Sequence, residues 1–148
     1  MKHNKFLVIA GTLSFIASLL HIACIFGGPD WYRFFGAGEQ MAKLADQGSA
    51  YPVFVTSIIA AILTIWALYA LSGAGVILKL PLLKTALVLI TSVYLVRGVA
   101  GFIAPFVTTS QLIHHNSVEF WIISSTICSI YGLFYLLGTL KYLRQQKQ

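Results

Sequence analysis

Residues 53–78 read VFVTSIIAAILTIWALYALSGAGVIL, and no charged side chain interrupts them. At 1.5 Å of rise per residue, a helix of about 20 residues matches the roughly 30 Å hydrocarbon thickness of a bilayer. Three further runs have a similar length and character, over residues 6–26, 82–107 and 118–140. Backbone amides inside hydrocarbon must find hydrogen-bond partners within their own segment, so each run is predicted to be a membrane-spanning helix.

The composition of the chain agrees with a membrane environment. Of its 148 residues, 58% are hydrophobic and 9% are charged, whereas a soluble domain carries about 25% charged residues. We therefore expect one all-α transmembrane domain over residues 1–148, folded as a four-helix bundle. The first run is longer than the apolar core of a signal peptide and no small-residue cleavage pattern follows it, so it is interpreted as a membrane helix.

Positive charges are distributed unevenly between the two sides of the four runs. Seven cations lie on the side of the two chain ends: Lys2, Lys5, Lys79, Lys84, Lys141, Arg144 and Lys147. The opposite side has two cations and all four acidic residues: Arg33, Lys43, Asp30, Glu39, Asp46 and Glu119. Because positive residues are retained in the cytoplasm during insertion, we predict a multi-pass protein of the bacterial cytoplasmic membrane with both termini cytoplasmic.

The net charge of +6 does not indicate nucleic-acid binding, since the cations are spread over three short segments beside the apolar runs. The bilayer itself is the expected partner, with a modest attraction to anionic lipid. The two cysteines, Cys24 and Cys128, are predicted at different depths, which argues against a disulfide between them.

The long connection between the first two runs is rich in aromatic residues. Acidic and basic side chains recur in it at helical spacing, so a short helix at the membrane surface is predicted over residues 29–48. Asp30 is its candidate N-cap and Gly48 its candidate end, although Gly36 and Gly38 interrupt the pattern. Two roles remain open for this segment: an aromatic anchor at the interface, or a lid over a binding site.

Stripes of small residues on three of the runs predict where the helices pack, because membrane helices associate through close approach of small side chains. The stripe on the first run contains Gly11, Ser14, Ser18 and His21; that on the second contains Ala60, Thr64 and Ala67; that on the fourth contains Trp121, Ser125, Cys128, Gly132 and Tyr135.

Arg97 is the one cation within the interior of an apolar run, and its Cα is predicted to lie roughly 12 Å below an outer end at Pro105. An arginine at that depth costs about 2.5 kcal/mol or more, so its guanidinium should either face the bundle interior or extend outward to water and phosphate. Both orientations are compatible with the sequence.

An inward orientation would bring Arg97 near other polar residues in a pocket open to the outer leaflet. The predicted ligand-binding residues are Arg97, His21, Tyr94 and Ser18, with Glu39 and Glu119 as the carboxylates that would balance its charge. If neither carboxylate reaches the guanidinium, the pocket should favour an anion, since carboxylate and phosphate fit the guanidinium fork.

His114, His115 and Glu119 form a second polar cluster near the start of the fourth run. Histidines and a carboxylate can hold zinc, but no recognised ligand spacing is present, and a solvated helix start is the ordinary interpretation. No nucleophile elbow, phosphate loop or dinucleotide fingerprint occurs, so no cofactor and no bound metal are expected.

The Gly-rich Phe35-Gly36-Ala37-Gly38-Glu39 and the Arg97-Gly98 pair are short motifs that resemble those of small bacterial four-helix membrane proteins of the DoxX-like kind. The resemblance spans the chain in topology. It implies a four-helix bundle, and no functional residue is carried over from it.

Three functions are compatible with these features. The leading hypothesis is a membrane protein that binds or transports a small amphipathic or anionic ligand at Arg97 and His21. The alternatives are a membrane-embedded enzyme with a histidine-based site, and an accessory subunit that docks onto a larger membrane complex. A homo-oligomer is also compatible, because four helices enclose only a narrow space.

Overall fold

The computed structural model describes residues 3–107 and 117–146. These residues form helices joined by turns and contain no strand. The helices are α1 (Lys5–Phe34), α2 (Glu39–Asp46), α3 (Tyr51–Gly73), α4 (Leu83–Val107) and α6 (Val118–Gln145). All but α2 are long and apolar enough to cross a membrane, which confirms the prediction of an all-α protein with four candidate spans.

The apolar side chains of the long helices point mainly outward. In the most apolar window of each helix, between 17% and 33% of the residues are buried. Large side chains such as Phe15, Val96 and Ile123 are exposed. An apolar surface of this extent is not tolerated in water, but it is the surface that lipid chains require. The chain is therefore a multi-pass membrane protein.

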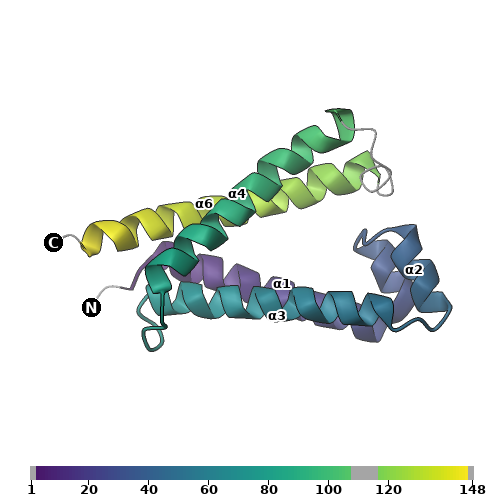
Figure 1. The fold of residues 1–148 in the computed structure, drawn as a ribbon, viewed down its shortest axis with the longest axis horizontal. Coiled ribbons are helices and arrows are strands. Elements are labelled where there is room, and N and C mark those ends of the chain that lie inside the picture. The colour runs from purple at the N-terminus through teal and green to yellow at the C-terminus, as the bar shows by residue number, and fades with distance from the viewer. Residues whose placement is uncertain (1–2, 108–116, 147–148) are drawn as a thin grey trace.

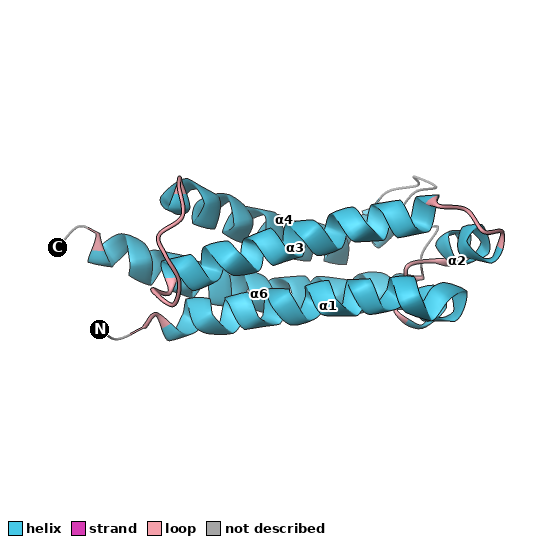
Figure 2. Cartoon of the chain, turned by 90° about the horizontal axis from the view of Figure 1, so that it is seen from below, coloured by secondary structure: helices cyan, strands magenta, loops and turns pink. Residues whose placement is uncertain are grey.

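The four long helices are arranged as two pairs. Helix α1 packs chiefly on α3, and α4 packs chiefly on α6. Both chain ends and the α3–α4 loop lie at one end of the molecule, here called the terminal end, whereas α2 lies at the other, the α2 end (Figures 1 and 2). The pairs lie close together at the terminal end and diverge towards the α2 end (Figure 1). Helices α3 and α4 are antiparallel (Figure 1), although each makes its main contacts elsewhere.

Small residues set the spacing within each pair. A Cβ added at Gly11 of α1 would come 3.1 Å from the backbone oxygen of Ala67 on α3. Further along the same seam, the hydroxyl of Ser18 donates to the Ala60 backbone oxygen at 2.8 Å and lies 2.8 Å from the Thr64 hydroxyl. Gly11 and Ser18 of the first predicted stripe and all three residues of the second therefore lie where α1 and α3 meet, whereas Ser14 bonds to α4 and α6 and His21 within α1.

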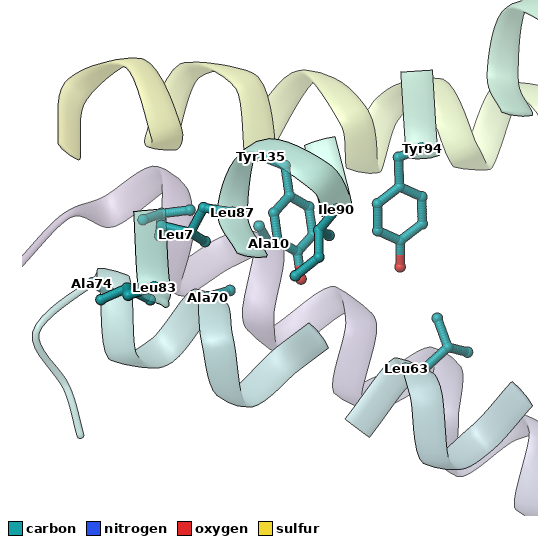
Figure 3. Close-up of a cluster of buried hydrophobic side chains, with 10 residues drawn as sticks. All are labelled: Leu7, Ala10, Leu63, Ala70, Ala74, Leu83, Leu87, Ile90, Tyr94 and Tyr135. Carbon is teal, nitrogen blue, oxygen red and sulfur yellow. The ribbon is translucent and has the colours of Figure 1, made fainter. Parts of the chain in front are cut away.

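A chain of hydroxyl groups joins all four long helices at the centre of the bundle. The hydroxyl of Tyr135 donates to the Trp66 backbone oxygen at 3.0 Å, so it accepts from Ser14 at 3.0 Å. Ser14 in turn lies 3.2 Å from the Tyr94 hydroxyl, which therefore donates to it. Figure 3 shows Tyr94 and Tyr135 pointing from α4 and α6 towards the other helix pair. Their rings are stacked, with centroids 5.3 Å apart.

The segment after the first span differs from the single helix predicted over residues 29–48. Helix α1 bends at Gly28, where φ is 68°, and continues through Pro29 to Phe34 instead of ending. Asp30 therefore lies within α1 and is not an N-cap. The chain then leaves the helical path because Gly36 and Gly38 adopt positive φ angles of 72° and 96°.

Helix α2 begins after that break and packs on the bent part of α1. Its Ala42 lies in a small buried cluster with Cys24 and Tyr32 of α1. Its C-cap is Gln47, followed by Gly48 with a φ of 72°, close to the predicted end. Both cysteines of the chain are free thiols.

Two helix ends differ from the predicted ones. Helix α3 ends at Gly73, five residues before the end of its apolar run, because the Ser72 hydroxyl donates to the Leu78 backbone oxygen and accepts from the Leu80 amide. Gly75 adds a positive φ of 76° to this turn. Helix α6 continues past its apolar run to Gln145, so its last turn carries the Arg144 side chain beyond the span.

Candidate functional site

Arg97 lies in the second half of α4, ten residues before the last described residue of that helix, which places its Cα about 15 Å from the end. Its guanidinium is half-buried against α6. One terminal nitrogen donates to Ser124 Oγ at 3.0 Å and the other to Ser125 Oγ at 3.3 Å. Two neutral hydroxyls thus replace part of the water that a guanidinium holds in solution.

The guanidinium extends towards the α2 end. One of its terminal nitrogens lies where a Cβ on Gly101, one turn further along α4, would be. Side chains on a helix lean towards its N-terminus, so Arg97 has turned against its usual direction. This brings the charge nearer to the membrane surface and places it over the Trp121 ring, 4.7 Å from the centroid. Both predicted orientations are partly realised, since the guanidinium contacts α6 and also extends outward.

Three of the four acidic side chains of the chain are engaged elsewhere. The sequence has four acidic residues, and three of them pair with Arg33: Asp30 at 3.2 Å, Glu39 at 3.1 Å and Asp46 at 2.6 Å. The fourth, Glu119, is exposed on the first turn of α6 and forms no ion pair within the described residues. Neither Glu39 nor Glu119 therefore balances the charge of Arg97.

The Arg33 cluster joins the bent part of α1 to both ends of α2. Its atoms are largely exposed, so its ion pairs are screened by water and contribute little to stability individually. The Arg33 guanidinium nevertheless holds the pKa of the Glu39 carboxyl below its usual value of 4.5, chiefly through its hydrogen bonds. This cluster fixes α2 against α1 at the end of the molecule nearest Arg97.

Tyr94, Ser18 and His21, which were also predicted to bind the ligand, form their hydrogen bonds with partners other than Arg97. Tyr94 belongs to the central hydroxyl chain through Ser14, and Ser18 bonds across to α3. The Nδ1 atom of His21 lies 2.7 Å from the Ala17 backbone oxygen of its own helix, so this nitrogen carries the proton. The structure thus divides the predicted pocket among three places: the α4–α6 seam, the bundle centre and the α1–α3 seam.

The connection between α1 and α2 contacts the start of α6. A Cβ added at Gly36 would come 2.6 Å from the Phe120 ring, so this ring lies directly against the backbone of the connection. The Phe120 ring also packs edge-on against Trp121, with centroids 5.9 Å apart. The connection is therefore linked to the Arg97 site through two successive aromatic rings.

His114 and His115 lie outside the described residues. Within residues 3–107 and 117–146, no three His, Cys, Asp or Glu side chains gather closely enough to hold a metal ion.

The three side chains that hold Arg97 were not assigned to it from the sequence. Trp121, Ser124 and Ser125 occupy positions i, i+3 and i+4 of α6 and so share one face. Trp121 and Ser125 were assigned to a packing stripe, and Ser124 to none. Equal depth alone would not have identified them, because Gly98 lies beside Ser129, and Arg97 reaches Ser124 and Ser125 by extending its side chain towards the α2 end.

The site combines a cation, two hydroxyls and an indole face at the seam of α4 and α6. The two hydrogen bonds described above use two of the five N–H donors of the guanidinium, and its positive charge lacks a carboxylate partner among the described residues. Such an arrangement can bind an anion. Comparison of the chain with known protein families, curated proteins and solved structures finds no match.

Proposed function

We propose that this protein binds a small anionic or amphipathic molecule in the outer half of the bacterial cytoplasmic membrane, with Arg97 recognising its negative charge. The protein would act as a ligand-binding or transport protein. The observation that carries this proposal is the half-buried guanidinium, held by Ser124 and Ser125 and balanced by no acidic side chain of the chain.

An arginine without a counter-charge costs free energy within an apolar span, so we expect it to have a function that offsets this cost. A bound carboxylate or phosphate supplies the missing charge, and the planar guanidinium binds either through paired hydrogen bonds. The amphipathic character of the ligand follows from the surroundings, because exposed side chains such as Val96 and Ile123 flank the site on the lipid side.

The proposal also gives the connection between α1 and α2 the role of a lid over the Arg97 site. Its contact with Phe120 favours the lid role over a simple interfacial anchor, since Phe120 packs on the Trp121 ring, and the guanidinium lies over that ring.

The cations gathered at the terminal end favour cytoplasmic termini. Reporter fusions to the two ends should then both report the cytoplasm, and reports from opposite sides would refute the orientation.

Binding to the full-length protein in an uncharged detergent tests the role of Arg97. Dodecyl phosphate is titrated into wild type, Arg97→Leu and Lys43→Leu, the last of which removes an exposed cation from the same end of the molecule. Loss of a charged hydrogen bond predicts about a tenfold or greater weakening for Arg97→Leu and none for Lys43→Leu. Equal binding by wild type and Arg97→Leu would reject the proposal.

A further inference from the structure

Two adjoining grooves lie at the terminal end, far from Arg97. The loop groove has a volume of about 680 Å³ and is lined by residues 79–85, Tyr142 and Gln146. The helix groove has a volume of about 470 Å³ and is lined by Lys84, Leu140, Leu143, Arg144 and Gln146. Both volumes fall within the range of small-molecule sites, and the grooves meet at Lys84 and Gln146.

Cations from separate elements surround these grooves. Lys79 comes from the α3–α4 loop, Lys84 from the first turn of α4 and Arg144 from the last turn of α6. All four acidic side chains of the chain lie towards the opposite end, three in the Arg33 cluster and Glu119 at the start of α6. The grooves therefore carry a positive field that no nearby acidic side chain offsets.

The walls between these cations are apolar. Leu140 and Leu143 line the helix groove, and Leu82 lines the loop groove with 79% of its surface exposed. Leu78, 89% exposed, immediately precedes the loop-groove residues and lines neither groove. Leu82 also has a φ of 51°, a backbone conformation that is uncommon for leucine and therefore needs support from its surroundings. Exposed leucines beside lysines are costly in water, but they suit the boundary between lipid headgroups and acyl chains.

We infer that the terminal end binds one anionic phospholipid, with its phosphate between Lys84 and Arg144 and the upper part of its acyl chains against Leu140 and Leu143. The arrangement matches the chemistry of such a lipid, which carries a phosphate directly above hydrocarbon. Basic grooves between membrane helices are a known means of holding anionic headgroups. This site is independent of the proposed ligand at Arg97, which lies on the far half of the same helix pair.

Lipid binding to the full-length protein in an uncharged detergent tests this inference, with bound lipids counted by native mass spectrometry. Phosphatidylglycerol is compared with phosphatidylcholine of the same acyl chains. The variant Lys84→Gln with Arg144→Gln removes both proposed phosphate ligands. Each cation near an anionic lipid contributes about fivefold to binding, so the double variant should bind phosphatidylglycerol about 25-fold more weakly.

The matched control is Lys5→Gln with Lys141→Gln, which removes two cations from the same end without altering a residue that lines either groove. It should keep the affinity of the wild type for phosphatidylglycerol. Lys84 and Arg144 are exposed, so the double variant should unfold at the same temperature as the wild type.

Three results would overturn the inference. The first is undiminished phosphatidylglycerol binding by the Lys84→Gln, Arg144→Gln variant. The second is an equal loss in the control variant, which would mean that the attraction is diffuse. The third is displacement of the lipid by free glycerol phosphate at equal concentration, which would assign the site to a water-soluble phosphate instead.

Discussion

Gly98 of α4 lies against Ser129 of α6 so closely that a Cβ at residue 98 would come 3.1 Å from the Ser129 backbone nitrogen and 3.3 Å from its Cα. The added carbon would also collide with the Ser129 hydroxyl. Since Arg97 precedes Gly98 in the chain, the approach of these two backbones also determines how far the guanidinium must extend to reach Ser124 and Ser125.

Replacing Gly98 by alanine should push α4 away from α6. The obstacle is partly backbone, which cannot rotate aside, so we expect a destabilisation of about 1–3 kcal/mol in reversible unfolding from mixed micelles. Ser129→Ala removes the hydroxyl but not the backbone contact, and it should recover part of the loss in the double variant. A Gly98→Ala protein as stable as the wild type would show that the helices are not this close.

Tyr135→Phe should loosen the centre of the bundle. The substitution deletes the hydroxyl that bonds both Ser14 and the Trp66 backbone oxygen while keeping the stacked ring. Hydrogen bonds between membrane helices contribute about 1 kcal/mol each, so a loss of about 1–2 kcal/mol in the free energy of unfolding is expected. Tyr51→Phe, at an exposed tyrosine, is the control and should leave stability unchanged.

The attachment of α2 should depend on pH through Glu39. Because the Arg33 guanidinium lowers the pKa of this carboxyl from its usual 4.5, the ionised form is favoured in the folded protein. Its contribution is therefore complete above pH 4.5 and is lost as the pH falls through the lower folded-state pKa. After correction for the intrinsic pH dependence of amide exchange, the protection of the α2 amides should fall over that interval, and the fall should be smaller in Glu39→Gln. An unchanged pH profile in Glu39→Gln would exclude this carboxyl as the cause.

The arrangement of spans was predictable because bilayer thickness imposes a length on every apolar run, and the four candidate spans followed from that rule alone. The seam of Gly11, Ser18, Ala60 and Ala67 was also predictable, because only small residues allow such close approach. The pairing of α1 with α3 and of α4 with α6 was not, since three of the four runs carry a comparable stripe and several pairings satisfy the pattern.

The surroundings of Arg97 could be predicted only in part. The free-energy cost of an arginine in hydrocarbon indicated that polar groups must contact its guanidinium. Whether these groups are serine hydroxyls of α6 or carboxylates depends on the bend at Gly28, which the sequence did not predict. That bend brings Arg33 to Glu39 and Asp46, and so keeps these acids away from Arg97. The first run was predicted to end at residue 26, whereas the direction of the chain after Gly28 is a property of the tertiary packing.

The most direct measurement of the Arg97 site uses Trp121 as its reporter, because the indole ring lies 4.7 Å from the guanidinium carbon. The difference in fluorescence between the wild type and Trp121→Phe isolates this indole while α-bromododecanoate or its uncharged methyl ester is added to micelles. If Arg97 binds anions, the bromo acid should quench Trp121 at a lower concentration than the ester, and Arg97→Leu should abolish the difference. Equal quenching by acid and ester in the wild-type protein would contradict the account.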